Sequence, residues 1–110
     1  MNLVVATEAA FAGDADVLVV DATGNRDRML GRILDSTAPF VLVIAGPELA
    51  PIERAMILAA IGPLAIELGP DRRIGALDIA IEAGETDIVA VARFLVAAES
   101  TTGQVIAVAA

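Results

Sequence analysis

The residue types that could do chemistry in this chain are few. The sequence has no His, Cys, Tyr, Lys or Trp, and its ionisable side chains are Asp, Glu and seven Arg. This set lacks the usual general acids and bases of neutral pH, the common covalent nucleophiles and the lysine that binds phosphate in nucleotide sites. We therefore expect no catalytic residue and no enzyme, and an enzyme that uses Asp or Glu alone is our weakest hypothesis.

Two groups of carboxylates have spacings that suggest a site. They are Asp14, Asp16 and Asp21, and Glu82, Glu85 and Asp87. The first group resembles a metal cluster, but it lacks the Gly and the bidentate Glu of a calcium loop. The second group resembles an acid pair, although a solvated loop and helix start explain it more simply. We favour turn and helix-start roles for both groups and expect no metal.

The arginines offer two candidate anion contacts. Arg54 is either an anion contact, for an acyl-CoA phosphate or a partner, or a solvated charge beside Glu53. We favour the second, because surface ion pairs are common and contribute little. The pair Arg72-Arg73 either forms a small anion site or complements the C-terminus of a helix, and we favour the helix C-terminus.

Composition and charge exclude several partners. The chain has 110 residues, is 57% hydrophobic and carries a net charge of −8. An acidic chain has no electrostatic footprint for nucleic acid and is repelled by anionic lipid. The longest apolar run, AMILAAIGPLAI, is shorter than the about 20 residues that span a bilayer. We expect one cytoplasmic domain over residues 1–110, with no nucleic acid and no membrane as partner.

Short apolar runs alternate with helical patterns along the chain. Continuous β-branched runs of this kind are typical of strands that are buried on both faces of a parallel sheet. Five such runs are present, at residues 2–6, 16–21, 40–45, 74–80 and 104–110. Three main helices are predicted at residues 25–36, 51–68 and 86–100. Asn25 is the predicted N-cap of the first helix, and Thr86 is that of the third. The alternation predicts an α/β fold, a small open, mostly parallel sheet of about five strands with right-handed crossovers.

The first predicted connection is too short for this scheme. The segment TEAAFAGDA has fewer than the dozen or so residues that a parallel crossover normally needs. Either it holds one helical turn, or the strand at residues 2–6 is an irregular edge.

Five segments of the chain occur in a distinctive order. They are DVLVVDATG, FVLVIAG, LAIELGP, RIGALDI and VARFLVAAESTTGQVIAVAA. This order resembles the C-terminal half of short-chain dehydrogenases/reductases, from about Asp16 to the end of the chain. In the last segment, Phe94-Leu95 is followed after a short gap by Thr-Gly-Gln-Val, as in the family's final helix and strand. The resemblance implies a Rossmann-like sheet that has lost one half.

The family's chemical parts are missing at the matching positions. Its Gly-rich cofactor loop corresponds to residues 6–10, which contain no glycine, and its Asn-Asn-Ala-Gly strand end corresponds to residues 20–24, where Asp21 would repel a phosphate. Counting back from the end of the long helix puts Ala50 at the family's tyrosine and Arg54 at its lysine. Without the tyrosine there is no proton donor. The resemblance therefore implies a degenerate, catalytically inert relative that binds no cofactor.

The helix predicted at residues 51–68 is apolar on almost every side. Glu53 and Glu67 fall within about 40° of each other around the axis, at about 100° per residue. A helix on an open sheet needs an apolar stripe only about 100° wide, so the other apolar residues need a second cover. The residues that we predict to face outward into an interface are Ile52, Met56, Ala59, Ala60 and Pro63.

These observations leave two hypotheses of different classes. The leading one is a non-catalytic subunit that stabilises an active short-chain dehydrogenase/reductase, or a second copy of itself, through this helix and the helix after Asn25. By analogy with the family, the partner's expected chemistry is oxidation or reduction of a hydroxyacyl or ketoacyl thioester. The alternative is a small module that binds an acyl or nucleotide ligand at the strand ends, with Gly24, Gly46 and Arg54 as candidate contacts.

Overall fold

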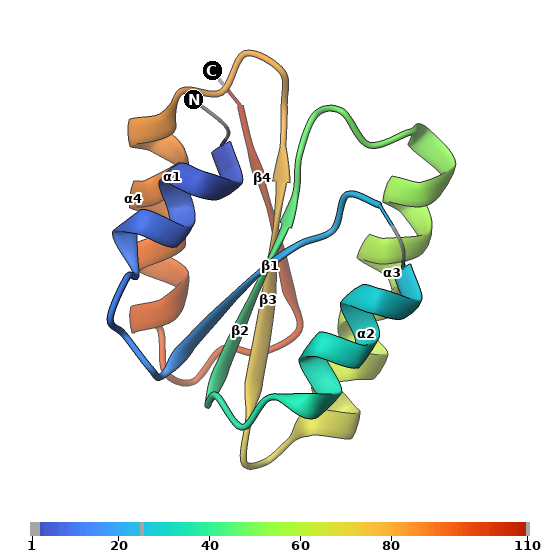
Figure 1. The fold of residues 1–110 in the computed structure, drawn as a ribbon, viewed down its shortest axis with the longest axis vertical. Helices are drawn as coiled ribbons and strands as arrows, with labels where there is room; N and C mark the ends of the chain where they lie inside the picture. The colour runs from blue at the N-terminus through green and yellow to red at the C-terminus, as the bar shows by residue number, and fades with distance from the viewer. Residues whose placement is uncertain (1–2, 25, 110) are drawn as a thin grey trace.

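The computed structural model describes residues 3–24 and 26–109. Within them, four helices alternate with four strands (Figure 1). In chain order the elements are α1 (Leu3–Ala10), β1 (Val17–Asp21), α2 (Arg26–Asp35), β2 (Phe40–Ala45), α3 (Pro51–Leu68), β3 (Arg73–Ile79), α4 (Glu85–Ala97) and β4 (Gln104–Val108). No helix of the described residues is long and apolar enough to cross a membrane.

The strands form one parallel sheet in the order β1-β2-β3-β4. This confirms the predicted α/β class and its Rossmann-like arrangement, with four strands in place of the predicted five. β2 is buried along its whole length, because it has a strand on each side and helices over each face. Its continuous run FVLVIA has the apolar side chains that such a position requires.

The prediction of a strand at residues 2–6 was wrong. Residues 3–10 form α1, and residue 2 lies outside the described residues. A short apolar run fits a buried strand or a buried helix equally well by pattern alone. Here the run continues into the good helix formers of EAA at residues 8–10, and the helix packs beside α4 and β1. The short connection that followed the predicted strand is explained, since no crossover begins there.

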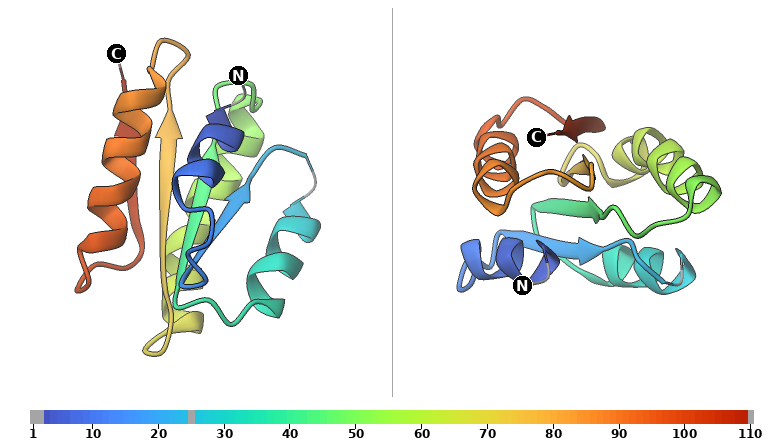
Figure 2. Two further views of the ribbon diagram at one scale, coloured as in Figure 1. Left: turned by 60° about the vertical axis from the view of Figure 1, so that its left-hand side comes forward. Right: turned by 90° about the horizontal axis from the view of Figure 1, so that it is seen from above.

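Helices cover both faces of the sheet. Figures 1 and 2 show α2 and α3 on one face and α1 and α4 on the other. Since the strands succeed one another in a single direction, the crossovers through α2 and α3 are right-handed and the crossover through α4 is left-handed. The prediction of right-handed crossovers was therefore wrong for the last one. Both sheet faces are apolar, and α4 covers the face that α2 and α3 leave open.

Each face of the sheet has its own core. On the α2 and α3 face, Met29, Ile33, Ile57 and Ile61 are buried against alternate strand residues. On the other face, helix α4 contributes a buried row to the second core. That core contains Val19, Phe40, Leu42, Ile44, Leu77, Ile79, Ala83, Ile88, Ala92, Leu95 and Val108.

The helix ends differ in part from prediction. The predicted cap Asn25 lies outside the described residues. Thr86 is not the cap of α4, because Gly84 occupies the N-cap without any side-chain hydrogen bond and Thr86 lies in the first turn. Asp87 lies in that first turn, as expected, where its negative charge interacts favourably with the positive end of the helix dipole.

Arg72 and Arg73 complement helix C-termini, as predicted, but not the end of the helix that precedes them. Arg72 donates from Nη1 to the carbonyl of Ile33 in the last turn of α2, at 2.9 Å. Arg73 donates from Nη2 to the carbonyl of Val96 in the last turn of α4, also at 2.9 Å, and its guanidinium lies 4.6 Å from the centre of the Phe40 ring. These adjacent residues therefore fix one helix on each face of the sheet.

Candidate functional site

The start of α3 occupies the place where the sequence resemblance predicts catalytic residues. Ala50 is the N-cap of α3 and has an extended backbone, with φ −64° and ψ 148°. Pro51 begins the helix, which suits proline because the first helical N–H has no partner in the helix. Ala50 has no ionisable side chain, so nothing at this position donates a proton.

Arg54 faces inward from the first turns of α3. Its Nη1 donates to Oδ1 of Asp78 at 2.5 Å and to the carbonyl of Ala45 at 3.2 Å, and its Nη2 donates to the carbonyl of Gly46. The Arg54 side chain is only 21% exposed. Our preference for a solvated charge beside Glu53 was therefore wrong, and the alternative of an anion contact stays a prediction that this pairing disfavours. Arg54 joins α3 to the carboxyl ends of β2 and β3.

The carboxyl ends of the strands carry mainly negative charge. Asp21 ends β1, and Asp78 lies near the end of β3. After β2, the Glu48 carboxylate accepts a hydrogen bond from the hydroxyl of Thr23 at 3.0 Å, which joins the loops after β1 and β2. Arg54 is paired with Asp78 among these carboxylates, and Arg28 and Arg32 of α2 line the hollow beside Asp21. The carboxylates after β2 and near the end of β3 disfavour a phosphate or pyrophosphate group there.

The strand order also bears on ligand binding. Open α/β sheets bind ligands at the carboxyl ends of strands, in the crevice where the strand order reverses. The four described strands follow one another without a reversal, so they form no such crevice. The three residues predicted for a ligand-binding module are not brought together as an open site, because Arg54 is engaged by Asp78 and Gly46 is buried beside the Glu48 carboxylate.

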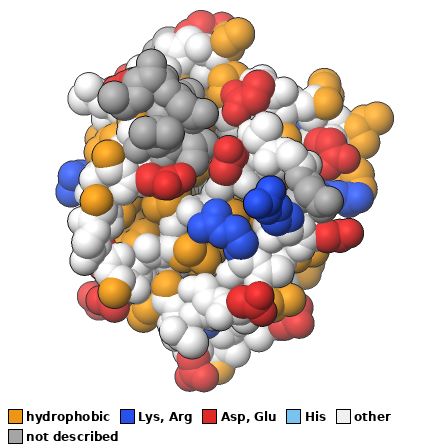
Figure 3. Space-filling model, viewed as in Figure 1, with side chains coloured by type: hydrophobic (Ala, Val, Ile, Leu, Met, Phe, Trp, Pro, Cys, Tyr) orange, Lys and Arg blue, Asp and Glu red, His pale blue; other side chains and the backbone are white. Residues whose placement is uncertain are grey.

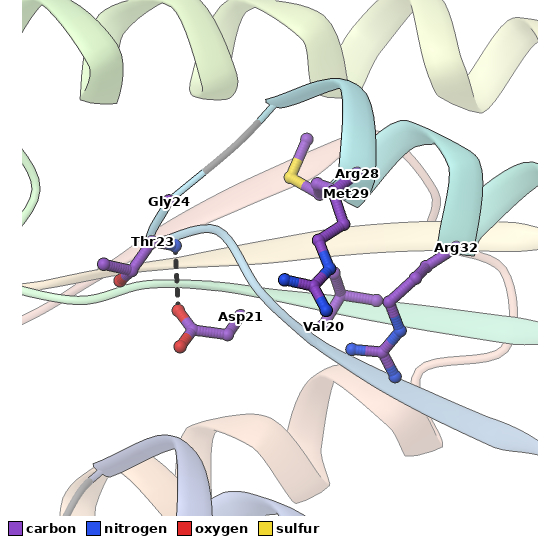
Figure 4. A pocket seen from close by; sticks show the side chains of 7 residues that line it. All are labelled: Val20, Asp21, Thr23, Gly24, Arg28, Met29 and Arg32. Atoms are coloured by element: carbon purple, nitrogen blue, oxygen red, sulfur yellow. Dashed lines mark hydrogen bonds between the residues drawn. The ribbon is translucent and has the colours of Figure 1, made fainter.

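A hollow of about 410 Å³ lies between the end of β1 and α2. Figure 4 shows Arg28 and Arg32 extending from α2 toward β1, while Asp21 and Thr23 lie at the strand end. The Thr23 N–H donates to Oδ1 of Asp21 at 2.8 Å. Gly24, which has φ +103°, turns the chain away from the strand.

The predicted carboxylate groups have turn and helix-start positions. Asp14 accepts a hydrogen bond from the backbone N–H of Asp16 at 3.0 Å, as Asp21 does from Thr23. Glu85 and Asp87 lie in the first turn of α4. Among the described residues, no three His, Cys, Asp or Glu side chains lie close enough together to hold a metal ion.

The outward side of α3 is apolar over its whole length. Ile52 is 75% exposed and Ile66 is 84% exposed, and they lie at opposite ends of the helix. We call the exposed row of Ile52, Met56, Ala59, Pro63 and Ile66 the α3 strip. Four of its members are among the five predicted interface residues, and Ile66 was missed, although it lies on the same helical face as Ala59.

Ala60, the fifth predicted interface residue, is half buried and packs against the core of the α2 and α3 face. It lines a small groove between α2 and α3 together with Met56 and Arg26. Across this groove, Arg26 forms an ion pair with Glu53 at 3.5 Å. Ala60 therefore lies beside the α3 strip and not on it, and the interface role of all five residues stays a prediction.

The chain is similar to one family of known proteins. A family model described as short chain dehydrogenase-like protein matches residues 22–108, and the chain belongs to this family. No curated protein and no solved structure matches the chain. The family match covers β2, α3 and β3, and thus includes the positions of Ala50 and Arg54.

Sequence reasoning missed the partner of Arg54. Asp78 lies on β3, and the contact depends on the register of β2 with β3 and on the rotation of α3 about its axis. The sequence did hold one signal. Asp78 is the single charged residue inside the apolar run IGALDIA, and a charge in a buried strand normally has a partner.

Proposed function

We propose that this chain is a non-catalytic subunit that assembles through the α3 strip with an active short-chain dehydrogenase/reductase or with a second copy of itself. The observation that carries the proposal is the exposure of two isoleucines on one face of α3, Ile52 and Ile66. Large exposed apolar surfaces on a folded domain usually mark an interaction site. We place this assembly in the cytoplasm. The chain has no cysteine, and disulfides are common in small secreted domains but rare in cytosolic ones.

The residues at the start of α3 support the absence of catalysis. Ala50 offers no proton donor, and the guanidinium of Arg54 is held by Asp78 and by two backbone carbonyls. Arginine does not serve as a proton donor or acceptor in proteins. If the partner oxidises or reduces a hydroxyacyl or ketoacyl thioester, the chemistry belongs to the partner.

The shape of α3 supports assembly by helix packing. Small residues let two helices approach closely, and Ala59, Gly62 and Pro63 form the middle of the exposed face, between the larger Ile52 and Ile66. Burying an isoleucine that was exposed contributes about 1.5–3 kcal/mol. Burial of two isoleucines from each of two facing helices would offset part of the entropy that the two chains lose on association.

The test is the variant Ala59→Arg, examined by analytical ultracentrifugation at low micromolar concentration, alone and with a candidate reductase partner. Ala59 is exposed in the middle of the α3 strip, so an arginine there leaves the fold intact and puts an unpaired charge into the contact. We expect at least a tenfold weaker association with an unchanged circular dichroism spectrum. Glu67→Arg is the matched control on the same helix, where the native residue is already charged and exposed.

Two results would contradict the proposal. One is a wild-type chain that remains a monomer and does not bind the partner. The other is association that Ala59→Arg leaves unchanged, which would mean that α3 is not the interface. The alternative of an acyl- or nucleotide-binding module has less support, because the strand ends are acidic and Arg54 is already paired.

A further inference from the structure

No strand of the described residues pairs with the outer edge of β1. β1 pairs with β2 alone, and it is the first strand of the sheet. Its two faces are nevertheless covered, because Val19 and Val20 are buried, one in the core of each sheet face. β4, the strand at the opposite edge, has three of its five residues exposed. β1 is thus an interior-like strand in an edge position.

The backbone groups that face the open edge can be identified from the ladder. The Ala22 N–H donates to the Ile44 carbonyl, and the Asp16 carbonyl accepts from the Phe40 N–H. Even-numbered residues therefore face β2. Because successive residues of a strand direct their amides to opposite sides, the amides of Val17, Val19 and Asp21 face outward. The Val17 N–H already donates to the Asp14 carbonyl at 3.3 Å, so the edge is open at Val19 and Asp21.

β1 lacks the features by which edge strands usually prevent pairing. Such strands carry a proline, a bulge or an inward-pointing charge. The sequence VLVVD has none of these before its last residue, and its register with β2 is continuous. An edge of this kind is a template for strand addition by another polypeptide.

The charge beside this edge is positive, although the chain is acidic overall. Arg28 and Arg32 line the hollow next to Val20 and Asp21. Figure 3, in which β1 lies toward the viewer, shows two neighbouring basic groups beside hydrophobic side chains, with acidic groups around them. A strand that lies along β1 would pass below both guanidinium groups.

A second copy of the chain does not fit this edge. If two β1 strands paired about a two-fold axis perpendicular to the sheet, α2 of each copy would lie on the same sheet face. Arg28 and Arg32 of both copies would then face one another across the seam, and like charges held in this way disfavour the pairing. The occupant must bring negative charge.

We propose that the outer edge of β1 accepts an extended segment of a partner protein in which acidic and apolar residues alternate. Arg28 and Arg32 are one helical turn apart, which is about 6 Å along the axis, and residues i and i+2 of a strand are about 6.6 Å apart. Two carboxylates at i and i+2 therefore meet the two arginines on one face. The apolar residue between them points to the other face, toward Val17, Val19 and Phe11, and extends that core.

The test uses a fluorescent peptide with the core Val-Glu-Val-Glu-Val and a matched peptide with the core Val-Lys-Val-Lys-Val. Binding to the full chain is followed by anisotropy at low salt, and backbone pairing by the amide resonances of Val19 and Asp21. We expect the acidic peptide to bind at least tenfold more tightly than the basic one and to shift both amides. The surface does not involve α3, so this outcome is independent of assembly through the α3 strip.

Variants locate the contact. Arg28→Glu/Arg32→Glu should reverse the preference between the peptides, whereas Arg26→Glu, whose native side chain pairs with Glu53 of α3, should not change it. Val19→Pro removes an outward N–H without removing a bond to β2 and should abolish binding of both peptides. If Val19→Pro does not fold, the peptide preference of Arg28→Glu/Arg32→Glu still tests the proposal.

Three results would overturn the proposal. The first is equal affinity for the two peptides, or no binding of either. The second is retention of acidic-peptide binding in Arg28→Glu/Arg32→Glu. The third is a wild-type dimer that Val19→Pro converts into monomers, because a second copy would then occupy the edge.

Discussion

Replacing Arg54 with methionine should destabilise the fold, because three acceptors lose their donor. These acceptors are the Asp78 carboxylate and the carbonyls of Ala45 and Gly46. Breaking a fully buried ion pair costs about 3–5 kcal/mol, whereas an exposed pair is worth about 0–1 kcal/mol. The side chains of Arg54 and Asp78 are 21% and 34% exposed, so water screens part of the effect. We expect a loss of about 2–3 kcal/mol in the free energy of unfolding.

The assay is urea unfolding followed by circular dichroism, with the m-value as a check that the same surface unfolds in each variant. Arg54→Lys should lose less than Arg54→Met, since it keeps the charge but cannot donate in a planar fork to three acceptors. Glu53→Gln is the matched control, one residue away, because its ion pair with Arg26 is 3.5 Å long and both side chains are more than 40% exposed. It should change stability by about 0.5 kcal/mol or less. A methionine variant as stable as this control would refute our account of Arg54.

Two further predictions concern packing and cofactor binding. Gly75→Ala should lower the free energy of unfolding in urea by about 1–3 kcal/mol, because its new Cβ would lie 2.6 Å from Cδ2 of Leu95. Gly62→Ala, in the open middle of α3, should instead raise that free energy by about 1 kcal/mol. Equal effects of the two substitutions would contradict the packing described here. Calorimetry should detect no binding of oxidised or reduced nicotinamide cofactors, because the acidic strand ends and the missing glycine loop disfavour a pyrophosphate, and micromolar affinity for either would contradict this prediction.

The parts of the fold with strong local signals could be predicted from sequence. The bounds Pro51–Leu68 and Phe40–Ala45 agree with the structure, because Pro51 marks a helix start and FVLVIA is a continuous apolar run. The run at residues 2–6 was ambiguous, since three or four apolar residues fit either element. The left-handed crossover through α4 could not be predicted, because it depends on which sheet face the other helices leave uncovered.

The candidate sites divide in the same way. The apolar excess of α3 was visible in the sequence, since it depends only on helical periodicity. The placement of Ala60 beside α2 was not, because it depends on how two helices pack. The pairing of Arg54 with Asp78 joins residues that are distant in sequence, and only the assembled sheet brings them together. The open edge of β1 likewise becomes visible only once the strand order is known.

The strand order has a consequence for how the chain folds. Each strand pairs only with the strand before or after it in the chain, so every pairing closes a single strand-helix-strand segment. Short closures of this kind lower the contact order of a parallel sheet, and a low contact order favours fast folding. The sheet can therefore grow strand by strand during synthesis from the ribosome, beginning with the pairing of β1 and β2. Until β3 arrives, the buried strand β2 is itself an edge, so the interval between β2 and β3 is when the nascent chain is most prone to aggregate.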